Sequence, residues 1–251
     1  SLEKEHPGDY RLLADKISLT KEEIASWQQV QEKIYLPKKE GTQLLEQFEG
    51  YFNLKEVLID KYDENDWPIR PEALKTTKTS QTQIIKQADV VMLLHLLGEE
   101  FDEETARLNY SYYEKRTMHG SSLSPSIYAI MGLKVGDASK AYRYLRRAAF
   151  LDLVDLQGNT REGIHAANAG GVWQTVVFGF AGLYTDDAGR LHINPRLPKE
   201  WKGLTFRIHC PQSWLEIHID AEQHVDITLL EGKEVDIFVH GTAVKAQKAD
   251  T

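Results

Sequence analysis

The apolar residues of the chain change their spacing near residue 185, and this change limits the fold to two parts. Before that point they recur mostly every three or four residues, the spacing that places them on one side of a helix. After Asp186 they alternate with polar residues, as in strands with one buried face. We therefore predict a mainly α chain with a C-terminal antiparallel β domain. The boundary is expected at Thr185–Gly189, giving a helical part over 1–186 and a β domain over 187–251.

Several helix starts carry capping signals. Thr20 and Glu23 form a capping box, Asp102 stands at an N-cap position, and Ser124 before Pro125 predicts another N-cap. Because short loops join successive helices, we expect antiparallel helical hairpins. The expected helical segments are Thr20–Leu36, Thr79–Leu97, Phe101–Arg116, Pro125–Leu133, Ser139–Val154 and Ile164–Leu183.

Strands are expected where apolar residues alternate between turn signals. The polar tail after Gly241 is expected to fray rather than to form structure. The alternating groups are Leu191/Ile193, Phe206/Ile208, Leu215/Ile217/Ile219, Val225/Ile227/Leu229 and Val235/Ile237/Val239.

Charge and cysteine content exclude several classes of protein. Lys+Arg 30 against Asp+Glu 38 give a net charge of −8, which disfavours nonspecific binding to nucleic acid or to an anionic membrane. No apolar run reaches the roughly 20 residues needed to span a bilayer. The single cysteine, Cys210, cannot form an internal disulfide or a cysteine-rich metal site, so we expect a cytoplasmic, reducing location.

Lys86 and Gln87 lie within an otherwise apolar segment that is expected to be helical. Polar groups in such a place are costly to bury unless each has a partner. In one interpretation Lys86 extends to the surface and Gln87 bonds a neighbouring helix. In the other, the pair faces a polar ligand, with the lysine as donor and the amide as donor and acceptor.

A second candidate site is the run Arg116–Pro125, in which His119, Gly120 and the hydroxyls of Ser121, Ser122 and Ser124 precede a predicted helix. Gly120 permits close approach of the backbone, and Ser121 and Ser122 bring hydroxyls to a helix N-terminus. Free N–H groups and hydroxyls at such a place bind anions, and His119 can add a donor or a charge. The alternative is an ordinary helix start.

Two further segments leave both a functional and a structural interpretation open. In Gly163–Gln174, small residues permit close helix packing, and His165 is either a packed histidine or a ligand-binding one. The polar, proline-containing loop at Tyr62–Arg70 offers an aromatic platform at Trp67 and carboxylates, or is simply a solvated acidic loop. Its carboxylates are Asp63, Glu64 and Asp66.

Taken together and in this order, the segments resemble glycoside hydrolase family 65, which consists mainly of inverting phosphorylases of maltose, trehalose, kojibiose or nigerose. Four collinear motifs carry the resemblance. They are KQADV from Lys86, RTMHGSSLSPSIYA at Arg116–Ala129, GIHAANAGGVWQ at Gly163–Gln174 and LHINPRLPKEW at Leu191–Trp201.

The resemblance implies part of an (α/α)6 barrel followed by a small β domain. It assigns glucose binding to Lys86 and Gln87. It assigns inorganic phosphate, the co-substrate, to the remaining matched positions, and it implies no metal or organic cofactor. The general-acid glutamate of the family precedes KQADV by more residues than this chain has, so no catalytic residue is expected here. The phosphate-binding positions are His119, Gly120, Ser121, Ser122 and His165.

The implied reaction is phosphorolysis of a glucose disaccharide to β-glucose 1-phosphate, performed by a longer parent protein of which this chain is the C-terminal part. Bound phosphate replaces the carboxylate that an inverting hydrolase uses to activate water. A hydrolase of the same family and a non-catalytic carbohydrate-binding fragment are the alternatives. Half a barrel would also expose apolar helix faces and favour self-association.

Overall fold

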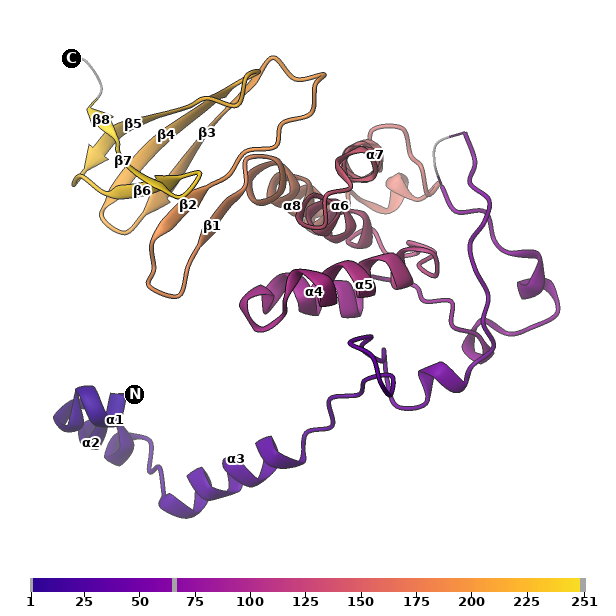
Figure 1. The fold of residues 1–251 in the computed structure, drawn as a ribbon, viewed down its shortest axis with the longest axis horizontal. Helices are drawn as coiled ribbons and strands as arrows, with labels where there is room; N and C mark the ends of the chain where they lie inside the picture. Colours follow the sequence, from indigo (N-terminus) through magenta and orange to yellow (C-terminus); the bar gives the residue numbers. More distant parts are fainter. Residues whose placement is uncertain (1, 65–66, 249–251) are drawn as a thin grey trace. The chain divides into compact units, whose positions relative to one another are not determined.

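The computed structural model describes residues 2–64 and 67–248, and the chain divides into two units at Lys38 and Lys39. The described strands all belong to the second unit, and the first unit consists of three helices followed by irregular chain (Figure 1). It contains α1 (Leu2–Glu5), α2 (Pro7–Lys16) and α3 (Lys21–Lys33).

Helix α3 begins where the capping box predicts. The Glu23 amide donates to Thr20 Oγ1 at 3.1 Å, which satisfies one of the free N–H groups of the first turn. Its apolar stripe lies open, since more than half of the surface of Trp27, Val30 and Ile34 is exposed. Within the first unit, therefore, the helix buries none of its apolar stripe in a core.

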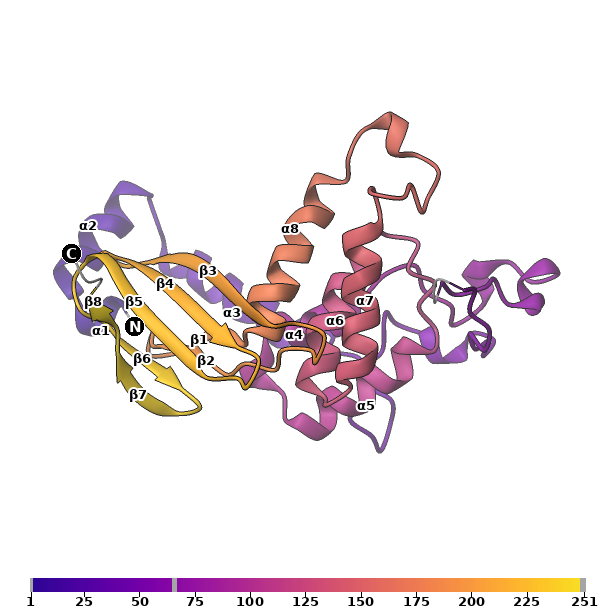
Figure 2. The same cartoon turned by 90° about the horizontal axis from the view of Figure 1, so that it is seen from above.

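The second unit begins with irregular chain and continues into helices. Helices α6 and α7 form an antiparallel hairpin, as expected, and α8 lies beside both (Figure 2). None of the described helices is long and apolar enough to cross a membrane. The helices are α4 (Asp89–Leu96), α5 (Glu103–Glu114), α6 (Ser124–Lys134), α7 (Ala138–Phe150), α8 (Ala166–Gln174) and the π-helix η6 (Thr175–Phe180). Short 3-10 turns stand at Tyr51–Asn53, Glu72–Lys75, Thr79–Gln81, Gly98–Glu100 and Thr160–Glu162.

The N-cap of α5 gives a direct stability test. Asp102 Oδ1 accepts from the Thr105 amide at 2.7 Å, as the sequence predicts. We expect Asp102→Ala to lower the free energy of unfolding by about 1 kcal/mol, because that amide loses its partner. Asp102→Asn keeps an acceptor and is the matched control. Urea titration measures both, and equal losses in the two variants would contradict the capping role.

The helix predicted over Thr79–Leu97 is wrong in its first half. Only α4 is α-helical there; Thr79–Gln81 forms a 3-10 turn, and residues 82–88 are irregular, with single bridges at Thr82 and Ile85. Thr82 pairs with Lys55 and Ile85 pairs with Thr117, both in parallel bridges. Hydrogen bonds to segments that are distant in the sequence thus outweigh the local apolar spacing.

The C-terminal region contains two four-stranded sheets, ordered β1-β2-β6-β7 and β3-β4-β5-β8. Neighbours are antiparallel, as predicted, except for the parallel pairs β2–β6 and β5–β8. The tail beyond Gly241 was expected to fray, and as far as Lys248 this is wrong, because β7 pairs with β6 and β8 pairs with β5; residues 249–251 lie outside the described residues. The strands are β1 (Leu183–Thr185), β2 (Leu191–Ile193), β3 (Gly203–Cys210), β4 (Ser213–Asp220), β5 (Val225–Gly232), β6 (Asp236–Val239), β7 (Thr242–Lys245) and β8 (Gln247–Lys248).

One apolar core joins the sheets to the helices. Ile217 and Ile219 on β4 are fully buried, and they belong to the same cluster as Leu133 of α6 and Phe180 of η6. The chain passes from η6 to β1 through Gly182, whose φ is +64°. The C-terminal ends of α6 and η6 are therefore anchored on the same core as the sheets.

Candidate functional site

Residues 85 and 86, shortly before α4, lie directly beside the segment that leads into α6. The Ile85 amide donates to the Arg116 carbonyl at 2.9 Å, and the Met118 amide donates to the Ile85 carbonyl at 2.9 Å. The Gly120 amide then donates to the Lys86 carbonyl at 3.0 Å. The structure thus brings together two segments that the sequence analysis singled out separately.

Gly120 lets the two segments approach closely. A Cβ atom at this position would lie 3.2 Å from Lys86 Cγ, a tight contact. Lys86 and Gln87 are exposed, and Gln87 Nε2 donates to Asp89 Oδ1 at 3.1 Å. Neither residue is on a helix. Both side chains lie at the exposed surface of the two hydrogen-bonded segments.

Ser121 and Ser122 are half-buried in the turn that starts α6. The Leu123 amide donates to Ser121 Oγ at 3.4 Å, and the Ser124 amide donates to the Ser121 carbonyl at 3.2 Å. The N-cap predicted at Ser124 is wrong. Leu123 is the cap residue and makes no side-chain cap bond, while the Ser124 hydroxyl bonds a histidine instead.

That histidine is His119, which is buried with 1% of its surface exposed. Its Nδ1 lies 2.8 Å from Ser124 Oγ and its Nε2 lies 3.2 Å from Tyr144 Oη. Tyr144 in turn donates to Glu114 Oε1 at 3.2 Å. The tyrosine oxygen therefore accepts from Nε2–H, and Nδ1 accepts from the serine.

The electrostatics agree with a neutral His119 ring. Burial, assisted by the positive charge of Arg147, lowers the pKa of His119 to about 3. Both ring nitrogens are engaged inside the protein, whereas the sequence analysis places this imidazole in an anion pocket. Its φ of +49° is also uncommon for a residue other than glycine, and the buried bonds hold that conformation.

His165 lies elsewhere, immediately before α8. Thr175 Oγ1 donates to the Ser126 carbonyl, and Gly179 approaches Leu133, so the α8–η6 segment runs parallel to α6. His165 accordingly lies toward the end of the helical layer at which α6 begins. Within the described chain its ring and its amide bond Asp152, its carbonyl accepts from the Ala169 amide, and none of its hydrogen bonds joins it to the turn at Ser121.

The acidic loop at Tyr62–Arg70 is only partly described, because Asp66 lies outside the described residues. The Trp67 amide donates to Asp63 Oδ1 at 2.7 Å. The guanidinium of Arg147 covers the Trp67 ring, so this face of the indole is not an open platform for a sugar.

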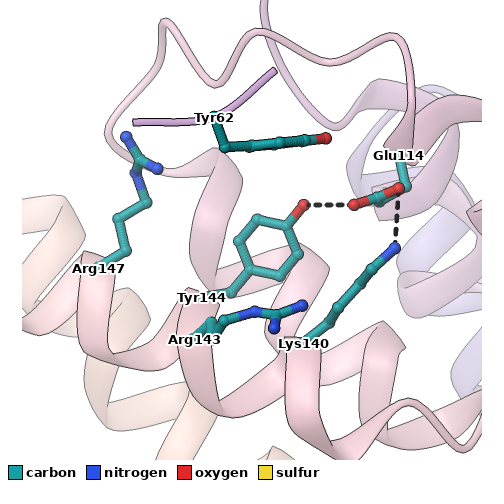
Figure 3. A pocket seen from close by; sticks show the side chains of 6 residues that line it. All are labelled: Tyr62, Glu114, Lys140, Arg143, Tyr144 and Arg147. Carbon is teal, nitrogen blue, oxygen red and sulfur yellow. Dashed lines mark hydrogen bonds and ion pairs between the residues drawn. The ribbon is translucent and has the colours of Figure 1, made fainter. Parts of the chain in front are cut away.

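A cavity of about 160 Å³ lies between the end of α5 and one face of α7 (Figure 3). Tyr144 joins it to His119, and Glu114 Oε2 pairs with Lys140 Nζ at 3.1 Å. Burial raises the pKa of Tyr144 well above its ordinary value, which keeps the hydroxyl protonated as a donor. The cavity is lined by Tyr62, Glu114, Lys140, Arg143, Tyr144 and Arg147.

The sequence analysis missed this cavity. One signal was present, since Lys140, Arg143 and Arg147 recur at helical spacing and so share one face of α7. Nothing in the sequence indicates that Glu114 and Tyr62 would close the opposite side.

The comparisons decide which family these elements belong to. The profile described as "Glycosyl hydrolase family 65 central catalytic domain" matches residues 2–174, more than half of the chain. The chain belongs to glycosyl hydrolase family 65. The profile described as "Glycosyl hydrolase family 65, C-terminal domain" matches residues 184–246, and the resemblance drawn from the four motifs is thereby confirmed.

Relatives within glycosyl hydrolase family 65 are similar along nearly the whole chain. Kojibiose phosphorylase from Thermoanaerobacter brockii is 55% identical over 92% of this chain and 30% of its own length. Kojibiose phosphorylase from Caldanaerobacter subterraneus subsp. tengcongensis is 54% identical over 96% of this chain and 31% of its own length. The chain therefore spans about 30% of the length of these curated relatives.

A solved structure shares the fold as well. It is described as "Putative kojibiose phosphorylase from human microbiome" and is 32% identical, with a TM-score of 0.80. The similar region includes 93% of this chain and 31% of the chain in that structure. The helical part followed by a sheet domain is therefore the arrangement of the family.

Proposed function

We propose that this chain is part of an inverting phosphorylase that cleaves a glucose disaccharide with inorganic phosphate to give β-glucose 1-phosphate. One observation carries the proposal: the Gly120 amide bonds the Lys86 carbonyl, so the pair Lys86-Gln87 stands beside the turn at Ser121 and Ser122. A sugar held by the pair would lie next to an anion held by the turn. Inverting displacement needs this arrangement, because the nucleophile must be bound at the face of the sugar opposite the leaving group.

The chemistry of the turn favours phosphate over activated water. Residues 116–124 contain hydroxyl, amide and basic groups and no carboxylate. Activation of water by an inverting hydrolase requires a carboxylate base, whereas phosphate is already anionic and requires donors. Ser121 and Ser122 supply two hydroxyls of that kind, while the Gly120 N–H already donates to the Lys86 carbonyl and holds the turn in place.

The two histidines take different roles in this proposal. His119 holds the turn through Ser124 and Tyr144. His165 offers a ring nitrogen to the phosphate. Lys86 and Gln87 bind glucose hydroxyls, and the general acid that protonates the leaving oxygen comes from outside this chain. We propose no metal or organic cofactor, a cytoplasmic location, and an (α/α)6 barrel to which residues 1–186 contribute, with 187–251 as the β domain.

Kojibiose is the first disaccharide to test, because the relatives with 55% and 54% identity are both kojibiose phosphorylases. We expect no product from the isolated chain. Fused after the upstream region of the Thermoanaerobacter brockii enzyme, the chain should release β-glucose 1-phosphate from kojibiose in a phosphate-dependent assay, with maltose and trehalose as comparison substrates.

Substitution of the serines tests the phosphate turn in that fusion. We expect Ser121→Ala with Ser122→Ala to lower kcat/KM for phosphate by about a hundredfold, because two hydroxyl donors to the anion are lost. Ser139→Ala, at an exposed position on α7, is the control. Phosphate-independent hydrolysis at an equal rate would identify a hydrolase, and product release by the isolated chain would overturn the assignment of the acid to another region.

A further inference from the structure

Asp152 holds His165 by two hydrogen bonds. The residues are thirteen positions apart, Asp152 shortly after α7 and His165 immediately before α8. The His165 backbone amide donates to Asp152 Oδ2 at 2.8 Å, and its imidazole Nδ1 lies 2.6 Å from Oδ1. The carboxylate therefore fixes both the start of α8 and the direction of the ring.

These bonds also determine which ring nitrogen carries a proton. The hydrogen bonds from His165 lower the pKa of Asp152, so its carboxylate is ionised near neutral pH and can only accept. Nδ1 must then be a donor, and Nε2 is the nitrogen left for another molecule. Within residues 2–64 and 67–248, Nε2 of His165 has no hydrogen-bond partner.

The contrast with His119 identifies the histidine that can reach a ligand. His119 is buried, and its two ring nitrogens form hydrogen bonds with Ser124 and Tyr144. In His165 only Nδ1 forms a hydrogen bond within the described chain, to Asp152, and 21% of the side chain is exposed. Of these two rings, only that of His165 presents a nitrogen outward.

We propose that Asp152 is a positioning residue, which holds Nδ1–H of His165 so that Nε2 faces the bound phosphate. The inference rests on the proposed function, in which phosphate is the ligand. A carboxylate that orients a histidine through its second nitrogen acts in the same way in metal sites, where its loss weakens ligand binding by about 10–100-fold.

The sign of the expected effect separates positioning from simple charge. Removing a carboxylate near a bound anion removes repulsion, so Coulomb's law alone predicts tighter binding of phosphate. Loss of positioning predicts weaker binding. The two accounts of Asp152→Ala therefore differ in direction.

Asp155 provides the matched control. It lies three residues further on and bonds the amide and hydroxyl of Thr160, at 2.9 and 2.6 Å, rather than His165. Asp155→Ala removes the same charge from the same segment and leaves the bonds of His165 in place.

The first measurement is the tautomer of His165 by 15N NMR in the whole chain, without ligand. We expect a protonated Nδ1 in the wild type and in Asp155→Ala, and a mixture dominated by Nε2–H in Asp152→Ala. An unchanged His165 spectrum in Asp152→Ala would overturn the proposal. If that variant does not fold, Asp152→Asn is isosteric and loses one acceptor, and an unchanged ring spectrum there would have the same consequence.

The second measurement is titration with inorganic phosphate, followed by the same His165 signals. We expect Asp152→Ala to weaken binding by about tenfold and Asp155→Ala to leave it unchanged. Equal or tighter binding in Asp152→Ala would overturn positioning. If phosphate leaves the signals of wild-type His165 unmoved, the proposed phosphate role of this histidine fails, and the tautomer measurement still decides what Asp152 does.

Discussion

Gly182→Ala should abolish stable folding of the second unit or lower its free energy of unfolding by about 4 kcal/mol or more. Gly182 has φ of +64°, and a Cβ atom there would lie 2.0 Å from the carbonyl oxygen of Asn194. The Gly182 carbonyl also accepts from the Asn194 amide at 3.0 Å, which fixes the two backbones together. The neighbour is main chain, so it cannot rotate away.

Gly189→Ala is the control for this prediction. Gly189 has a similar φ of +75°, but nothing lies within 4 Å of its added Cβ atom. Gly189→Ala should lower the free energy of unfolding by only about 1–2 kcal/mol, the cost of placing an alanine in the left-handed conformation. Thermal and urea unfolding of both variants measure the difference, and comparable losses would show that backbone conformation rather than the contact with Asn194 sets the cost.

The second large effect is a loss of stability in acid that originates at His119. Its pKa is about 3 in the folded chain, below the ordinary value of 6.5. Between pH 3 and pH 6.5 the His119 ring is protonated in the unfolded chain and neutral in the folded chain. Lowering the pH through this range therefore favours unfolding. The contribution is complete above about pH 6.5 and is lost as pH falls toward 3, by at most about 1.4 kcal/mol per pH unit.

His119→Asn isolates this contribution, because asparagine does not titrate and tolerates the positive φ of +49°. Urea unfolding of wild type and variant at pH 7, 6, 5 and 4 should give curves that converge as the pH falls. Parallel curves would mean that the ring takes up its proton without unfolding, and so is not enclosed as the structure has it.

Local signals predicted most of the helices and strands, because their causes are local. The caps at Thr20 and Asp102 are contacts between residues three apart, and the strands from Leu191 onward alternate by two. Failures occurred where a distant partner decided the outcome. Residues 82–88 are not helical because Thr82 pairs with Lys55 and Ile85 pairs with Thr117, and the tail from Thr242 to Lys248 forms strands because β7 pairs with β6 and β8 pairs with β5.

The candidate site shows the same division. Four motifs indicated the family and the segments involved, but not how those segments meet. The Ser124 hydroxyl caps no helix because it bonds His119, and the cavity on α7 needs Glu114 and Tyr62, which are distant in the sequence. The role of Asp152 could not be foreseen, since a lone aspartate after a helix carries no signal of its partner.

The bond between Gly120 and Lys86 joins peptide groups, not side chains. Substitutions at Gln87, Ser121 or Ser122 can therefore change which ligand groups each segment binds, while the distance between the two segments stays constant. Proline at position 120 would be different, because it has no N–H to donate. The main chain fixes the spacing between the two segments, and substitutions of the side chains along them leave that spacing unaltered.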